Sequence, residues 1–206
     1  MSARCRLIPR RSYLAGSLGI VLALTAGGFA GWDVVATRTA DRVHVTWQPD
    51  ASSCTGHALQ GGPKRLGLAG VPVLSVHPGT SCTVQVRVVN ASPRPVRLDS
   101  IIGGLLGPQS SHILTAVHAT DGGRPRGDRL DAYWPVHRTI APHHTARYRI
   151  GVRYRPSGCD GNASAMGIGG FPDAHITVLG RGYIRLGTRP LHWVQRGRSP
   201  GCGQPR

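Results

Sequence analysis

Arginines at alternate positions are the feature of this sequence that comes closest to a chemical site. In the segment 146–155, ARYRIGVRYR, basic and apolar residues alternate, so an extended strand would carry them on opposite faces. The basic residues are Arg147, Arg149, Arg153 and Arg155. Neighbours on such a face lie about 6.5 to 7 Å apart, close to the phosphate spacing of a polyanion. The pattern predicts an anion-binding face that Arg87 and Arg97 are candidates to extend.

An ordinary solvated strand surface is the competing interpretation of the same pattern. Charged outer faces are common on exposed sheets, and they discourage association between sheet edges. No aromatic residues interleave with the arginines on their own face, where they would be needed to stack bases. Nucleic acid is therefore not expected as a partner, and an anionic surface polymer remains the candidate ligand.

Other residue types that perform chemistry are present without the spacing they need. The ten histidines are scattered, and the adjacent pair His143 and His144 would point to opposite sides of a strand. Neither Gly-x-Ser-x-Gly nor Ser-x-x-Lys occurs, and Lys64 is the one lysine. The nine carboxylates are all aspartates, and their spacing singles out no pair for glycoside hydrolysis. We predict no catalytic residue, metal or cofactor.

Four cysteines follow the N-terminal region, and this even number is typical of a disulfide-bonded domain in an oxidising compartment. They are Cys54, Cys82, Cys159 and Cys202. No two of them are close enough to form the paired ligands of a zinc site. We favour bridges between chain neighbours, Cys54 with Cys82 and Cys159 with Cys202, although the other two connectivities stay open. Cys5 lies in the basic N-terminal region and is expected to be an unpaired thiol.

The first 42 residues have the organisation of an export signal. Residues 1–13 form a basic segment that stays in the cytoplasm, and residues 14–31 form a signal anchor that spans the membrane or a signal peptide that is cleaved. Residues 32–42 are a juxtamembrane linker, and 43–206 an extracytoplasmic domain. The segment Arg10-Arg11-Ser12-Tyr13-Leu14 resembles the twin-arginine motif, which implies export of a folded domain.

Period-two alternation predicts that the exported part is mainly β. Two of the clearest segments, 82–90 and 96–102, flank a polar turn and are expected to pair as a hairpin. The predicted strands are 43–48, 82–90, 96–102, 111–118, 133–137, 146–155, 175–179, 183–186 and 191–194. Abundant Gly and Pro and the absence of Glu disfavour helices. The layout resembles an immunoglobulin-like antiparallel β-sandwich.

Charge and compartment lead to three functional hypotheses. Four of the 25 cationic residues precede the apolar segment, which leaves 21 against nine aspartates and a net charge of +12 in the remainder. The first hypothesis is a bacterial envelope protein, anchored in the cell membrane, whose non-enzymatic domain binds another envelope protein or an anionic polymer. The second is a cleaved, secreted domain that binds such a polymer or another ligand. The third is a small hydrolase whose site the sequence does not reveal.

Overall fold

The computed structural model describes residues 31–55, 60–62, 64, 69–118, 124–159, 166–167, 171–189 and 191–195. It divides the chain into two units, Met1–Arg38 and Thr39–Arg206. Residues 31–41, most of the expected linker, are helical. The expected membrane or signal segment lies outside the described residues except for Gly31. Within the part of the chain that is described, no helix is long and apolar enough to span a membrane.

One layer of the second unit is a four-stranded antiparallel sheet. Its strands, in spatial order, are β1 (Val43–Cys54), β4 (Ser81–Asn90), β9 (Thr145–Tyr154) and β6 (Leu114–Val117). Burial alternates along β4 as the sequence predicts, with the inward residues Cys82, Val84, Val86 and Val88 at most 3% exposed. Valine suits this position because its branched side chain packs well on a pleated surface.

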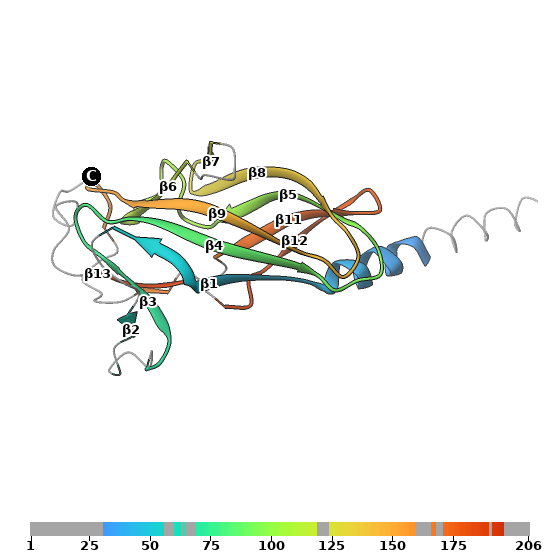
Figure 1. Cartoon of the computed structure of the whole chain (residues 1–206). Coiled ribbons are helices and arrows are strands. Elements are labelled where there is room, and N and C mark those ends of the chain that lie inside the picture. The colour runs from blue at the N-terminus through green and yellow to red at the C-terminus, as the bar shows by residue number, and fades with distance from the viewer. Residues whose placement is uncertain are drawn as a thin grey trace, which may run out of the picture. The chain divides into compact units, whose positions relative to one another are not determined.

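The second layer is a five-stranded antiparallel sheet. It contains β12 (Arg181–Arg185), β11 (Asp173–Val178), β5 (Val96–Gly103), β8 (Asp131–Ile140) and β7 (Arg126–Asp128) in that order. Figure 1 shows β4 and β9 running along one layer and β5, β8 and β11 along the other. The inward faces of both sheets are apolar and buried, so the arrangement is a β-sandwich.

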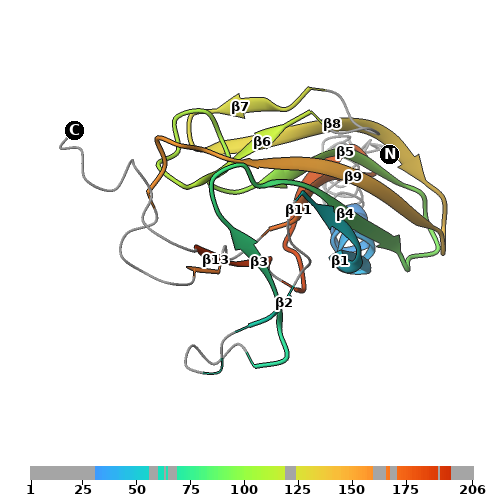
Figure 2. The same ribbon diagram turned by 60° about the vertical axis from the view of Figure 1, so that its left-hand side comes forward.

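A third, smaller sheet was not predicted. It comprises β10 (Met166–Gly167), β13 (His192–Gln195), β3 (Pro72–Val76) and β2 (Gln60–Gly61). Strands β13 and β3 are parallel, which brings His192 opposite Val73. Figure 1 shows β2, β3 and β13 together at one end of the sandwich, and Figure 2 shows the same three strands from another side. Four strands, β2, β3, β7 and β10, were not predicted. Strands β2, β7 and β10 have only two or three residues, and the buried residues of β3 are consecutive rather than alternating.

The nine predicted strands are all present, but the expected hairpin of 82–90 with 96–102 is wrong. Strand β4 pairs with β1 and β9, whereas β5 pairs with β11 and β8 in the other sheet. The polar segment between β4 and β5 is therefore a corner at which the chain crosses from one layer to the other. The chain crosses again between β5 and β6, between β6 and β7, and between β8 and β9. Crossings of this kind are usual in β-sandwiches.

Candidate functional site

Three of the four predicted arginines lie on the exposed face of β9. They are Arg147, Arg149 and Arg153. On the opposite face of the strand Tyr148, Ile150 and Val152 are at most 5% exposed and pack into the sandwich. The side-chain alternation predicted from the sequence is therefore confirmed for β9, although this placement by itself says nothing about a ligand.

Neighbouring strand β4 adds a fourth arginine to this face. Arg87 is the direct cross-strand partner of Arg147, and Gln85 is the partner of Arg149. Opposite residues of antiparallel strands have Cβ atoms about 4.5 to 5.5 Å apart, and like charges in such a pair destabilise the sheet. We call Arg87, Arg147, Arg149 and Arg153 the arginine face. It concentrates positive charge on two adjacent strands.

Little negative charge is available to balance the arginine face within its own sheet. The single carboxylate in the four strands of this sheet is Asp50, in the irregular part of β1 between Gln48 and Ser53. Arg97, considered as an extension of the face, belongs to β5 in the other sheet. There its Nε lies 2.9 Å from a carboxylate oxygen of Asp99. Arg97 is therefore separated from the arginine face and is ion-paired.

The last predicted arginine, Arg155, follows β9 and turns to the main chain. Its guanidinium donates hydrogen bonds to the carbonyl oxygens of Gly107 (2.5 Å), Pro108 (3.3 Å) and Ser110. Burial lowers the pKa of this guanidinium below its usual value. Arg155 thus holds the loop between β5 and β6, and we do not include it in the arginine face.

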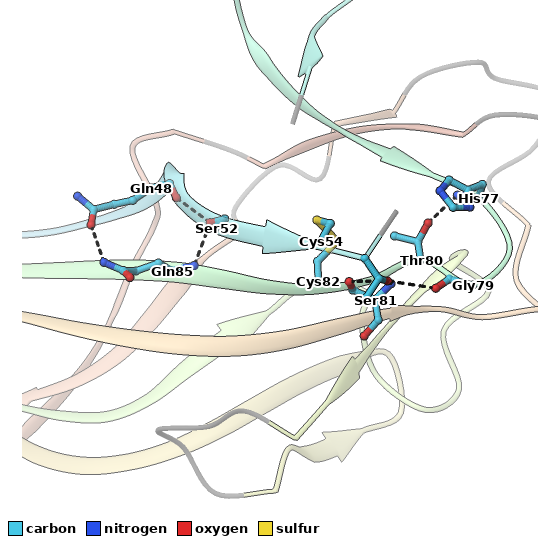
Figure 3. The surroundings of a disulfide bond; sticks show 10 residues. Gln48, Ser52, Cys54, His77, Gly79, Thr80, Ser81, Cys82 and Gln85 are labelled. Carbon is cyan, nitrogen blue, oxygen red and sulfur yellow. Dashed lines mark hydrogen bonds between the residues drawn. A yellow bond between two sulfur atoms is a disulfide. The ribbon is translucent and has the colours of Figure 1, made fainter. Parts of the chain in front are cut away.

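One of the two preferred disulfides is confirmed. Cys54 and Cys82 are bonded and occupy paired positions on β1 and β4 (Figure 3). Cys159 also belongs to a disulfide, but Cys202 lies outside the described residues, so that pairing stays a prediction. Close to the bridge, Ser52 Oγ donates to the carbonyl of Gln48 (2.6 Å) and accepts from the Gln85 N–H (3.0 Å), which secures the irregular stretch of β1 (Figure 3).

The described residues offer little for metal or hydrolytic chemistry. Among them there is no group of three or more His, Cys or Asp side chains that could hold a metal ion. Burial raises the pKa of Asp173 above 3.8, a hydrogen bond from the Gly187 N–H lowers it, and the charge of Asp131 raises it. Asp131 accepts the Leu105 N–H (2.8 Å) and Asp173 accepts that of Gly187 (2.8 Å), so both carboxylates bind the main chain.

A pocket of about 470 Å³ was not predicted. It lies beside β1 and the small sheet, and its lining includes Trp47, Pro72, Arg189 and His192. These residues are far apart in the sequence, and none of them belongs to a recognisable motif. Only the pairing of β13 with β3 and the path of the chain after β12 bring them together.

Comparison with known proteins gives no family. No family model matches the chain, and no curated protein matches it. A solved structure similar to it is that of a GH20 exo-β-N-acetylglucosaminidase from Vibrio harveyi in complex with N-acetylglucosamine, with 10% identity and a TM-score of 0.31. The match covers 75% of this chain and 18% of that enzyme. A likeness this small supports no conclusion about fold or activity.

Proposed function

We propose that this chain is a non-enzymatic bacterial envelope protein whose β-sandwich lies outside the cytoplasm and binds an anionic surface polymer through the arginine face. In this proposal the sandwich is of the immunoglobulin-like class. Residues 14–31 anchor it in the membrane with its C-terminal domain outside the cell.

The observation that carries the binding proposal is the direct pairing of Arg87 with Arg147. Two arginines at directly paired positions repel each other, and Arg149, two residues after Arg147 on the same face of β9, adds a further positive charge. A bound phosphate, sulfate or carboxylate group would relieve this repulsion and accept charge-assisted hydrogen bonds from the guanidinium groups. A polymer that repeats such groups can contact several arginines along the strand.

Location outside the cytoplasm is supported by the cysteines and by the N-terminal residues. The Cys54–Cys82 bridge is of a kind that persists in oxidising compartments. The four arginines before residue 12 and the uncharged segment 14–30 support an orientation in which whatever follows is exported. An excess of cations in an exported domain favours anionic partners at the cell surface.

Dextran sulfate, a soluble polyanion, provides the test of binding. We expect the wild-type chain to bind it and not to bind uncharged dextran, with affinity falling steeply as salt rises. Replacing Arg87, Arg147, Arg149 and Arg153 by Gln should flatten the slope of log K against log[salt] by about three to four, because each of the four lost contacts removes nearly one released counterion.

A second quadruple variant separates the arginine face from net charge. Its substitutions are Arg94→Gln, Arg124→Gln, Arg126→Gln and Arg129→Gln, which remove the same number of charges from exposed positions outside the arginine face. It should retain most of the wild-type slope. Equal slopes for the two quadruple variants would show that binding depends only on overall charge and would overturn the proposal.

Anchoring is tested separately. If residues 14–31 stay attached, the chain should remain in membranes washed with alkaline carbonate and should keep its original N-terminus. Release into the wash, together with an N-terminus near Thr37, would instead identify a cleaved signal and a secreted domain. The arginine-face proposal holds or fails independently of this result.

A further inference from the structure

The pocket beside β1 combines apolar walls with cationic or proton-donating groups. Trp47 and Pro49 come from β1, and Val71 and Pro72 precede or begin β3. Arg189 and His192 contribute a guanidinium and an imidazole. The described lining includes no carboxylate, so an anion entering the pocket meets no repelling charge from it.

The segment that carries Arg189 and His192 is held on both sides. Before Arg189, the Thr188 N–H donates to the carbonyl of Val45 (3.0 Å), and Gly187 forms a β-bridge with Val45. After it, the Leu191 N–H donates to the carbonyl of Phe171 (3.0 Å), and His192 begins β13. Binding groups fixed by main-chain hydrogen bonds lose little freedom when a ligand binds.

The pocket is separate from the arginine face. Along β1, Trp47 is 4% exposed and points inward, whereas its neighbours Thr46 and Gln48 point outward, toward the side on which Arg87 lies. Thr46 is the cross-strand partner of Arg87, and the side chain of Gln48 is uncharged. A ligand in contact with Trp47 therefore occupies the other side of the β1 strand from the polymer proposed above.

We propose that this pocket binds a small organic anion. Its apolar or aromatic body contacts Trp47, Pro49 and Pro72, and its carboxylate, sulfonate or phosphate group binds the guanidinium of Arg189 with His192 beside it. The volume of about 470 Å³ lies in the range of small-molecule sites and is far too small for a folded partner. Apolar walls with a few convergent polar groups are the usual composition of such sites.

Two matched probes test the proposal on the full chain. The first is 8-anilinonaphthalene-1-sulfonate, an aromatic anion, and the second is N-phenyl-1-naphthylamine, which has the same rings without the sulfonate. We expect saturable binding of the anion at one site, with a shift of the indole N–H resonance of Trp47, assigned from Trp47→Phe. The uncharged probe should bind at least tenfold more weakly.

Variants assign the site. Arg189 is exposed, so Arg189→Gln should leave folding intact while weakening the anionic probe about tenfold and leaving the uncharged probe unchanged. His192→Gln should weaken the anion less, and Arg147→Gln on the arginine face should have no effect. Equal affinity of wild type and Arg189→Gln for the anion, an unshifted Trp47 resonance, or no saturable binding would each overturn the proposal. None of these results bears on polymer binding.

Discussion

The side-chain amide of Asn90, the last residue of β4, donates a hydrogen bond to the main-chain carbonyl of Ile140, the last residue of β8 (3.1 Å). The same nitrogen lies within hydrogen-bond distance of the carbonyl oxygens of Arg94 (2.8 Å) and Ala141 (3.1 Å). The amide oxygen accepts from the N–H and the hydroxyl of Ser92 (3.1 and 2.7 Å). One fully buried side chain thus joins the β4–β5 and β8–β9 crossings between the layers.

Asn90→Ala is expected to lower the free energy of unfolding by about 3 kcal/mol. The substitution leaves the buried carbonyl of Ile140 and the buried N–H and hydroxyl of Ser92 without the Asn90 amide. Each unsatisfied buried group destabilises by about 1 to 3 kcal/mol. Urea denaturation followed by circular dichroism measures the change. Ser92→Ala, which removes one member of the same network, should lose about 1 kcal/mol. If Asn90→Ala lowers the free energy of unfolding by less than about 0.5 kcal/mol, water replaces the amide.

Removing the confirmed disulfide should also destabilise the chain. Cys54 and Cys82 are separated by 28 positions, and the chain-entropy model assigns a loop of that size about 3 to 4 kcal/mol. The double variant Cys54→Ser/Cys82→Ser is compared with wild type by urea denaturation under non-reducing conditions. Peptide mapping without reductant provides the control, since it must identify the Cys54–Cys82 peptide in wild type. A variant as stable as wild type would contradict the entropic argument.

The sequence predicted strands well and their partners less well, for a physical reason. Alternation along β4 or β9 reports which face of a strand is buried, and both patterns are present in the structure. It does not report which strand lies beside it. The turn after Asn90 has the polar and proline-rich composition of a hairpin turn, but the side chain of Asn90 binds carbonyls 50 and 51 residues away and so stabilises a corner between sheets.

Prediction of the candidate site was limited in the same way. Arg147, Arg149 and Arg153 follow from alternation, and Arg87 was already a candidate to extend the face because it alternates with the valines of β4. The main-chain bonds of Arg155 depend on carbonyls more than 40 residues earlier in the chain. The pocket likewise depends on tertiary pairing, and no spacing in the sequence connects Trp47 with His192.

Tyr148→Phe is expected to be at least as stable as wild type. Tyr148 is 5% exposed, and its buried hydroxyl has no hydrogen-bond partner. Loss of an unsatisfied hydroxyl should raise the free energy of unfolding by about 1 kcal/mol at neutral pH. Thermal unfolding and urea denaturation measure this. A loss greater than about 1 kcal/mol would mean that the hydroxyl is bonded in solution.

The pH dependence of the same variant gives a second measurement. Burial raises the pKa of Tyr148 above 10.0, and the positive charge of Arg138 opposes this shift. The folded state then favours the neutral phenol, so the contribution of Tyr148 to stability is complete below the unfolded pKa and is lost as pH rises through the folded pKa. Wild type should therefore lose stability relative to Tyr148→Phe in strongly alkaline buffer.

Asp173→Asn should stabilise the chain at neutral pH and have little effect in acid. Burial raises the pKa of Asp173 above 3.8, and the negative charge of Asp131 adds to the shift. The folded state then favours the protonated carboxyl, so the stability that Asp173 contributes is complete below the unfolded pKa and declines as pH rises through the folded pKa. Asparagine can still accept the Gly187 N–H through its amide oxygen.

The free energies of unfolding of wild type and Asp173→Asn, measured from about pH 3 to about pH 8, test this linkage. The advantage of Asp173→Asn at neutral pH should be at most about 1 kcal/mol, because a half-buried carboxylate is partly screened by solvent. It should shrink toward zero as pH falls below the usual carboxyl range, where wild-type Asp173 is also uncharged. Asp50→Asn removes an exposed charge and serves as the control. A difference that grows in acid would mean that ionised Asp173 stabilises the fold, and its bond to Gly187 would then outweigh burial and the repulsion from Asp131.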